Sequence, residues 1–116
     1  MGTAERRQLG ADGEAMAAAW YQAAGYTVLA RNWRCRDGEL DLVCEAGDTV
    51  VFCEVKARRS SAFGTPADAV TPTKQRRVRR LAGRWLATHP HADHRRVRFD
   101  VAAVTAGRLS VIVDAF

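Results

Sequence analysis

Residues 38–56, GELDLVCEAGDTVVFCEVK, constrain the fold more than any other part of the chain, because they have the pattern of a β-hairpin. Apolar residues dominate both halves, and Gly47-Asp48 is a turn signal between them. A turn centred on these two residues sets residue 46 opposite residue 49, so that the numbers of every opposed pair add up to 95. The sequence therefore predicts the register of the two strands as well as the strands themselves.

Charged residues interrupt these apolar strands at four positions: Glu39, Asp41, Glu54 and Lys56. The predicted register sets Asp41 opposite Glu54 and Glu39 opposite Lys56, with all four side chains on one face. Two carboxylates about 5 Å apart repel by roughly 3 kcal/mol at an effective dielectric constant near 20. A solvated polar face would leave this repulsion unexplained, so we expect a shared proton, a nearby cation or a divalent metal ion to offset it.

Carboxylate oxygens are the ligands that Mg²⁺ and Mn²⁺ prefer. A carboxylate pair beside a lysine also fits the needs of metal-assisted phosphodiester hydrolysis. In that chemistry the metal polarises the phosphate and lowers the pKa of its water, while the lysine orients or activates that water. The hairpin is therefore a candidate catalytic site with Mg²⁺ or Mn²⁺ as its cofactor.

The rest of the chain predicts a single domain over residues 1–116, with residues 1–7 flexible. We expect a helix at 8–24, strands at 26–33, 39–45 and 49–57, a second helix at 72–88, and strands at 97–105 and 109–113. The first three strands can form an antiparallel meander. The second helix can then act as a right-handed crossover to a strand parallel to the third. The predicted class is an α/β sandwich around a mixed sheet.

The second predicted helix has a clear start and two distinct faces. Thr71 is a suitable N-cap, and Pro72 fits the first helical position. One face is apolar, and five arginines cover the remainder: Arg76, Arg77, Arg79, Arg80 and Arg84. This basic face can either track a nucleic-acid backbone or simply be solvated. Lys74 lies in the first turn, an unfavourable place for a cation, which points to a phosphate partner.

The net charge of +5 favours a polyanionic partner, nucleic acid before membrane. The chain has 18 basic residues, of which only Lys56 and Lys74 are lysines. Two lysines in an arginine-rich chain indicate sites that need a compact ammonium group. The N-terminus lacks the apolar core of a signal peptide, and no apolar run is long enough for a membrane span. We therefore expect a cytoplasmic protein without a membrane partner.

Three further groups of residues have simple structural interpretations. Cys44 and Cys53 occupy apolar strand positions and are expected to be buried thiols rather than disulfide or zinc ligands. The histidines of HPHADH (89–94) are expected on a surface loop, with zinc binding as the alternative. Asp100 is expected to pair with Arg98, with support of the site as the alternative. The large aromatic residues Trp20, Trp85 and Phe99 are expected in the core, with base stacking as the alternative.

Asp41, followed after a twelve-residue gap by Glu54-Val55-Lys56, resembles the PD-(D/E)xK motif of the restriction-endonuclease-like superfamily. The chain is similar in more detail to the YraN family, through GELDLV, VFCEVKAR, Phe63-Gly64, Lys74 and RFDV. The resemblance runs from Gly13-Glu14 to the last strand. The proline of the superfamily motif is replaced by Leu40, as in other members of the family.

This resemblance implies a restriction-endonuclease-like αβββαβ core with an extra C-terminal strand, similar in layout to archaeal Holliday-junction resolvases. It implies that Asp41, Glu54 and the Val55 carbonyl are metal ligands and that Lys56 is the catalytic lysine. Glu14 would complete the site from the first helix, and Glu39 would have an outer role. The dimeric resolvases make a homodimer one expected assembly. Three basic residues are candidates for binding nucleic acid: Lys74, Arg58 and Arg77.

The favoured function is metal-dependent cleavage of DNA, in preference to RNA, with branched or single-stranded DNA as candidate substrates. A non-catalytic nucleic-acid-binding module or an adaptor in DNA processing is the alternative. An enzyme for a small phosphorylated ligand is less well supported, because the chain has no glycine-rich phosphate loop. The segment Arg58 to Ala67 follows Lys56 and is a candidate for a loop that closes on the substrate.

Overall fold

The computed structural model describes residues 2–59, 70–90 and 96–116. The helices and strands of these ranges follow the predicted order: α1 (Thr3–Ala23), β1 (Thr27–Cys35), β2 (Gly38–Ala46), β3 (Thr49–Arg58), α2 (Pro72–Thr88), β4 (Arg96–Thr105) and β5 (Arg108–Ile112). The element boundaries agree closely with the sequence prediction, except that α1 begins at Thr3 instead of residue 8. The predicted loop that closes on substrate lies mostly at 60–67, outside the described residues.

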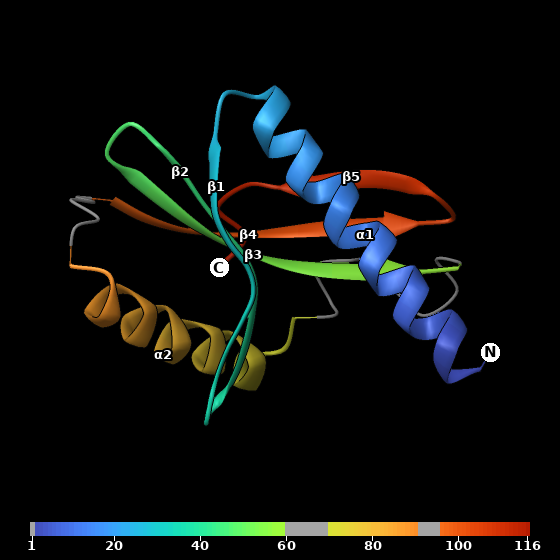
Figure 1. The fold of residues 1–116 in the computed structure, drawn as a ribbon, viewed down its shortest axis with the longest axis horizontal. Coiled ribbons are helices and arrows are strands. Elements are labelled where there is room, and N and C mark those ends of the chain that lie inside the picture. The colour runs from blue at the N-terminus through green and yellow to red at the C-terminus, as the bar shows by residue number, and fades with distance from the viewer. Residues whose placement is uncertain (1, 60–69, 91–95) are drawn as a thin grey trace.

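The five strands form one mixed sheet in the order β1-β2-β3-β4-β5 (Figure 1). Strands β3 and β4 are parallel, and the other neighbours are antiparallel. The fold is therefore the predicted α/β class, with the αβββαβ order and an extra C-terminal strand. Near the turn, β2 and β3 have the predicted register, from Ala46 opposite Thr49 to Leu42 opposite Cys53.

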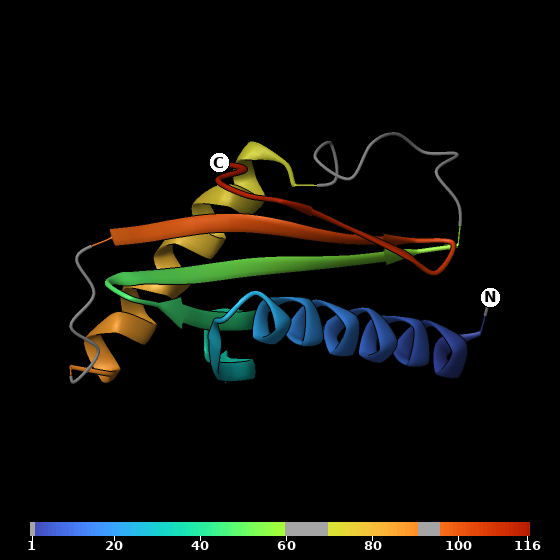
Figure 2. The same ribbon diagram turned by 90° about the horizontal axis from the view of Figure 1, so that it is seen from above.

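The two helices cover opposite faces of the sheet (Figures 1 and 2). Alternate residues of a strand point to opposite faces, and neighbouring residues of β3 accordingly belong to different cores. Phe52 packs in the core beneath α2, with Leu81 and Trp85. Val51 packs in the core beneath α1, with Ala17 and Tyr21. Each helix thus has its own apolar core, and β3 contributes to both.

The β1–β2 hairpin changes face partway along its length. In β2, Leu42 packs in the α1 core, whereas Leu40 packs in the α2 core. Two residues of the same parity would lie on one face of a regular strand. In β1, Ala30 and Trp33 both pack against the α2 core, although their positions differ in parity. Both strands are therefore bent at the residues between these pairs.

Asn32 supplies the backbone conformation for this bend. Its φ of 52° is in the left-handed region, which asparagine tolerates better than most residues. The described ladder pairs Arg31 with Leu42 and Trp33 with Leu40, but it skips Asn32 and Asp41. The register is the same on both sides, so the irregularity is a bend rather than a slip. It directs the end of the hairpin beneath α2, where Gly38 lies against Leu81.

Asp100 is fully buried and is held by a network on the α1 side of the sheet. Its carboxylate accepts hydrogen bonds from the Arg98 guanidinium at 2.8 and 2.9 Å, from the Tyr21 hydroxyl and from the Asp114 amide. The predicted Arg98–Asp100 ion pair is confirmed. The network joins β4 to α1, and its four hydrogen bonds compensate for the burial of the charge.

Most of the remaining side-chain predictions are confirmed. Trp85 and Phe99 are buried, but Trp20 is 39% exposed, so its assignment to the core was wrong. It lies on the outer side of α1, where its ring meets the edge of Tyr21. The described cysteines are free thiols, and both Cys44 and Cys53 are buried as predicted.

Of the three histidines at 89–94, only His89 lies within the described residues. His89 stacks on Trp85, at the end of α2, and its Nδ1 lies 2.7 Å from the Trp85 carbonyl oxygen. These contacts give His89 a structural role. His91 and His94 lie outside the described residues. In the described ranges, neither helix is long and apolar enough to cross a membrane.

Substitution of Asn32 tests the bend. Asn32→Gly should change the free energy of unfolding by less than about 0.5 kcal/mol, because glycine adopts a positive φ freely. Asn32→Val should destabilise the protein by about 1–2 kcal/mol, because a β-branched residue is strained in that region. Urea unfolding measures both values. Thr27→Val, at an exposed position of the same strand, is the matched control, and equal stability of Asn32→Val and wild type would contradict the assignment.

Candidate active site between the two helices

The candidate site begins where β2 separates from β3. The ladder between the described parts of these strands ends at Leu42 opposite Cys53. The predicted pairs Asp41–Glu54 and Glu39–Lys56 lie beyond this point and are not formed as backbone pairs. This part of the register prediction was wrong because the hairpin bends at Asp41.

A side-chain hydrogen bond occurs where the ladder stops. In the register of the hairpin, Val55 would exchange backbone hydrogen bonds with Leu40. The Val55 amide instead donates to Asp41 Oδ2 at 2.9 Å. The Asp41 carboxylate therefore satisfies an amide that the departing strand leaves without its backbone partner. This bond fixes Asp41 beside the Glu54-Val55-Lys56 segment.

The charged residues of the hairpin divide into two neighbouring groups instead of forming one row. Glu39 and Asp41 lie with Glu14 of α1, and one carboxylate oxygen from each is within 4.8 Å of the others. Glu54 points to the α2 side, where its Oε1 lies 3.2 Å from Lys74 Nζ. Asp41 lies at the boundary of the two groups, since its pKa responds to Glu54 as well as to Glu14 and Glu39.

Gly13 lets α1 bring Glu14 to this position. A Cβ atom at Gly13 would lie 3.1 Å from Ala57 Cβ and 3.5 Å from Val55 Cγ1. Contacts as short as 3.1 Å would push the helix away from β3. The glycine thus permits close packing against the strand that carries Glu54 and Lys56, and the next residue of the helix is Glu14.

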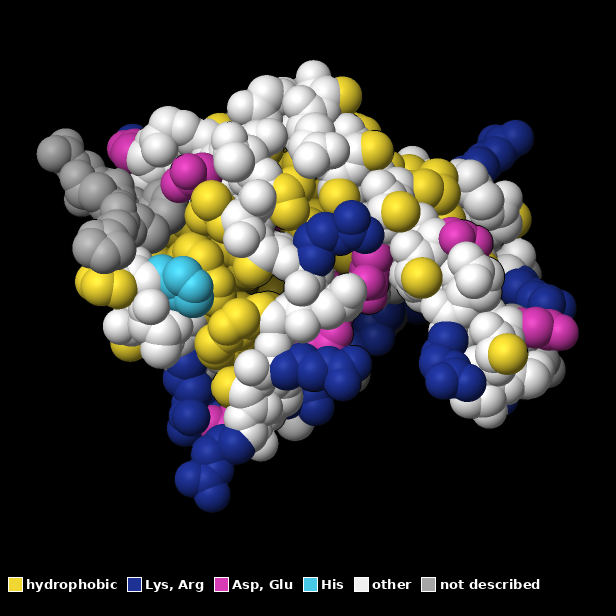
Figure 3. Space-filling view, viewed as in Figure 1, with side chains coloured by type: hydrophobic (Ala, Val, Ile, Leu, Met, Phe, Trp, Pro, Cys, Tyr) yellow, Lys and Arg dark blue, Asp and Glu magenta, His cyan; other side chains and the backbone are white. Residues whose placement is uncertain are grey.

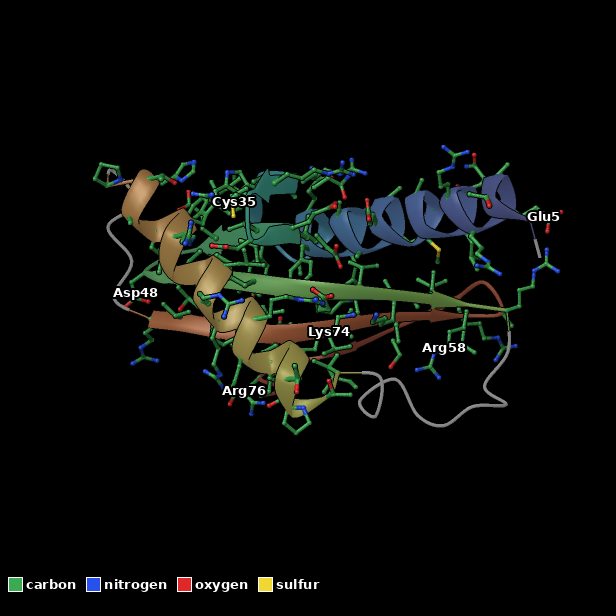
Figure 4. All side chains as sticks on the ribbon, turned by 90° about the horizontal axis from the view of Figure 1, so that it is seen from below. Glu5, Cys35, Asp48, Arg58, Lys74 and Arg76 are labelled. Atoms are coloured by element: carbon green, nitrogen blue, oxygen red, sulfur yellow. The ribbon has the colours of Figure 1, made fainter. Side chains whose placement is uncertain are left out.

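Both lysines of the chain lie at the site. Lys74 enters from the start of α2, where its amide donates to the Thr71 hydroxyl that caps the helix. Figure 4 shows Lys74 over the middle of β3, whereas Arg58 lies at the end of that strand. Lys56 is close enough to Lys74 and Glu54 for each to affect its pKa. The sequence indicated that the two lysines were special, but the spacing of 18 residues gave no sign that they meet.

Burial and neighbouring charges perturb the ionisation of the site. Burial is the main cause that raises the pKa of Asp41 from 3.8 to about 7, and repulsion from Glu54 adds to it. The hydrogen bond from Val55 acts in the opposite direction. Burial, followed by the neighbouring Lys74, lowers the pKa of Lys56 below its ordinary value. A carboxyl that titrates near neutrality and a lysine with a lowered pKa are typical of catalytic sites.

Basic side chains lie around the acidic recess, which is the space lined by Glu14, Glu39, Asp41 and Glu54. Figure 3 shows acidic side chains in a hollow beside α1, with Lys and Arg side chains on its borders. Arg34 forms an ion pair with Glu39 at 3.2 Å, a contact that the sequence analysis missed. Arg77 extends over Gly38 of the hairpin, and Arg58 ends β3. Both remain candidates for binding a phosphate backbone.

The rest of the arginine-rich face of α2 is not uniformly solvated. Arg79 lies over the ring of Phe99, with its guanidinium carbon 4.7 Å from the ring centre. Arg84 forms an ion pair with Asp37 in the turn between β1 and β2. These two arginines fasten α2 to the sheet and the hairpin, so a structural role accounts for part of the basic face.

The three-carboxylate group fits a divalent metal ion. Oxygen donors match the preference of Mg²⁺ and Mn²⁺. Opposite ligands of octahedral Mg²⁺ lie about 4.2 Å apart. The 4.8 Å limit that encloses Glu14, Glu39 and Asp41 is therefore close to a coordinating geometry. Glu54 is outside this group while it is paired with Lys74, and the proposed roles of Glu54 and the Val55 carbonyl as ligands remain predictions.

The fold and site define a small α/β domain with an acidic, lysine-containing recess between two helices. The model of the family described as "Uncharacterised protein family UPF0102" matches residues 13–104. The chain belongs to this family, also called the YraN family. The match begins at Gly13, which precedes Glu14, and it includes the other three carboxylates of the site and both lysines.

Curated relatives support this assignment over most of the chain. A UPF0102 protein of Beutenbergia cavernae is 57% identical over 100 residues, which cover 86% of this chain and 84% of the relative. The UPF0102 protein of Kineococcus radiotolerans is 56% identical over 97 residues, which cover 84% and 80% of the two chains. That of Mycolicibacterium vanbaalenii is 54% identical over 110 residues, which cover 95% and 90%.

The raised pKa of Asp41 predicts a pH-dependent effect of Asp41→Asn on the stability of the metal-free protein. The folded state disfavours the ionised carboxylate, so the wild type loses stability as the pH rises from about 4 to about 7. Asparagine keeps a hydrogen-bond acceptor for Val55 but cannot ionise. The variant should therefore gain stability relative to wild type across this interval, with a constant advantage above pH 7. Urea unfolding with a chelator present measures the difference, and a difference independent of pH would contradict the prediction.

Proposed function

We propose that this protein is a metal-dependent nuclease that hydrolyses phosphodiester bonds in DNA, with branched or single-stranded DNA as the substrate. The observation that carries the proposal is the convergence of three carboxylates and both lysines of the chain at the point where β2 leaves β3. A fold without catalytic or binding demands gains nothing from gathering these charges in a half-buried recess. A divalent cation and a phosphate group would compensate both signs of charge.

In this proposal Glu14, Glu39 and Asp41 hold Mg²⁺ or Mn²⁺, and Glu54 joins them when substrate is bound. The bound cation would polarise the phosphate and lower the pKa of a water molecule. The Val55 amide holds Asp41 Oδ2 at 2.9 Å, and one oxygen of the Asp41 carboxylate lies within 4.8 Å of oxygens of Glu14 and Glu39. Lys56 Nζ, with its lowered pKa, can hold the attacking water by a hydrogen bond or take up its proton. The arginines at the border would bind the flanking phosphates.

A second candidate function is a nucleic-acid-binding module or adaptor without catalysis. The Glu54–Lys74 ion pair favours it, because one acidic residue of the recess is already neutralised without a metal. Such a module would bind DNA in the presence of a chelator, and Asp41→Asn would not weaken the complex. Its affinity would fall steeply as salt concentration rises.

Cleavage of labelled DNA tests the two candidates. With Mg²⁺ or Mn²⁺ and a four-way DNA junction or a single strand, the wild type should cut. Glu14→Gln, Asp41→Asn and Lys56→Met should each reduce the rate by at least about a hundredfold, since each removes a group that acts on the reacting atoms. Asp12 is an exposed carboxylate on α1, the helix that also carries Glu14. Asp12→Asn should therefore retain the wild-type rate.

The controls separate loss of chemistry from loss of fold. Each variant should show the helix and sheet content of the wild type by circular dichroism. Cleavage by Lys56→Met or Asp41→Asn at the wild-type rate would contradict the nuclease mechanism. No cleavage by any protein, together with metal-independent binding of the same DNA, would favour the binding module instead.

A further inference from the structure

The Glu54–Lys74 ion pair occupies the position where the nuclease proposal requires a metal ligand. Lys74 Nζ is 3.2 Å from Glu54 Oε1, and the two side chains are only 19% and 9% exposed. An ion pair with so little exposure is weakly screened by water, and each partner depends on the other for compensation of its charge. For Glu54 to become a metal ligand, the metal ion must replace Lys74 as its partner, and this replacement costs free energy.

The place of Lys74 in α2 makes its own charge costly. It is in the first turn of the helix, which contains no acidic residue, so the helix dipole opposes an ammonium group there. Lys56 adds a second ammonium in the same recess. Glu54 is the carboxylate that pairs with Lys74 in the described structure. If a cation took Glu54, Lys74 would need another anion within reach.

We propose that Lys74 holds Glu54 in the metal-free protein and exchanges it for a phosphate oxygen of the substrate when the divalent cation binds. This inference rests on the nuclease proposal and assigns Lys74 a substrate-binding role. Glu54 gains the cation and Lys74 gains the phosphate, so the number of compensated charges is the same before and after. Metal binding without substrate is then opposed by the ion pair, and phosphate removes that opposition. Metal and substrate should accordingly bind with positive coupling.

If Lys74 competes with the cation for Glu54, removing its charge should tighten metal binding. If Lys74 has only a structural role, its removal should leave metal binding unchanged or weaken it. Lys74→Met keeps the length of the apolar stem but removes the competing cation. It should tighten Mn²⁺ binding in the absence of DNA by about tenfold, a typical magnitude for coupled sites. Lys74→Arg retains the charge and should remain within about threefold of the wild type. Isothermal titration calorimetry measures these affinities, and Arg96→Met, at the start of β4 opposite Thr49, controls for the change in net charge.

A double-mutant cycle shows whether the effect passes through Glu54. In a Glu54→Gln background the competition has no carboxylate to act on, so adding Lys74→Met should change Mn²⁺ affinity by less than about twofold. A gain of equal size in both backgrounds would assign the effect to general electrostatics and overturn the exchange. Unchanged or weakened Mn²⁺ binding by Lys74→Met alone would overturn it as well.

Removal of the Lys74 charge should have the opposite effect on DNA binding. With Ca²⁺ in place of Mg²⁺, Lys74→Met should bind a short four-way DNA junction about tenfold more weakly than wild type. The slope of log affinity against log salt should fall by about one, as expected for one lost phosphate contact. Equal affinity and equal slope in the wild type and Lys74→Met would show that Lys74 does not move to a phosphate.

The outcomes distinguish failure of this inference from failure of the proposed function. If wild type binds Mn²⁺ and Asp41→Asn does not, the metal site stands, and the Lys74 variants alone decide the exchange. If neither wild type nor Lys74→Met binds Mn²⁺, with or without the DNA junction, both the metal-dependent function and the exchange are wrong.

Discussion

The hydrogen bond from the Val55 amide to Asp41 is the interaction on which the rest of the site depends. An amide at the end of a ladder needs an acceptor, and a strand that bends away removes the backbone carbonyl that would serve. Asp41 supplies that acceptor from its side chain. The bond therefore lets β2 leave β3 without an unsatisfied amide, and it fixes one catalytic candidate beside the other two in Glu54 and Lys56. The opening between the strands and the site therefore both depend on a side-chain acceptor that takes the place of a backbone carbonyl.

The bend also explains why two helices, on opposite faces of the sheet, can contribute to one recess. Beyond Asp41 the hairpin turns beneath α2, and the space that it leaves is approached by Glu14 from α1 and by Lys74 from α2. Gly13 allows the first approach, and the Thr71 cap fixes the start of the second helix. Charges of both signs are thereby gathered in a half-buried space, where their interactions are stronger than in water. A bound cation and a phosphate would compensate these charges.

Much of this arrangement was predictable from sequence, because hydrophobic periodicity, turn residues and capping residues act locally. The mixed sheet, the two helices and the register from Ala46–Thr49 to Leu42–Cys53 follow from such patterns. The bend was not predicted, since it depends on the positive φ of Asn32 and on a bond between side chain and backbone. The charges were correctly singled out, but their division into two groups was missed for the same reason. The contact of Lys74 with Glu54 depends on where α2 docks, which no short pattern encodes.

The central claim is that the opening between β2 and β3 is a divalent-metal site, and Mn²⁺ titration followed by nuclear magnetic resonance tests it most directly. Paramagnetic broadening reports which amides lie close to the bound ion. We predict that signals of residues 13–14, 39–41 and 54–56 broaden first, at low Mn²⁺ concentration, and that Asp41→Asn abolishes this selectivity. Broadening confined to other carboxylates, such as Glu5 and Asp12 on the exposed part of α1, would contradict the account. The same pattern in wild type and Asp41→Asn would contradict it equally.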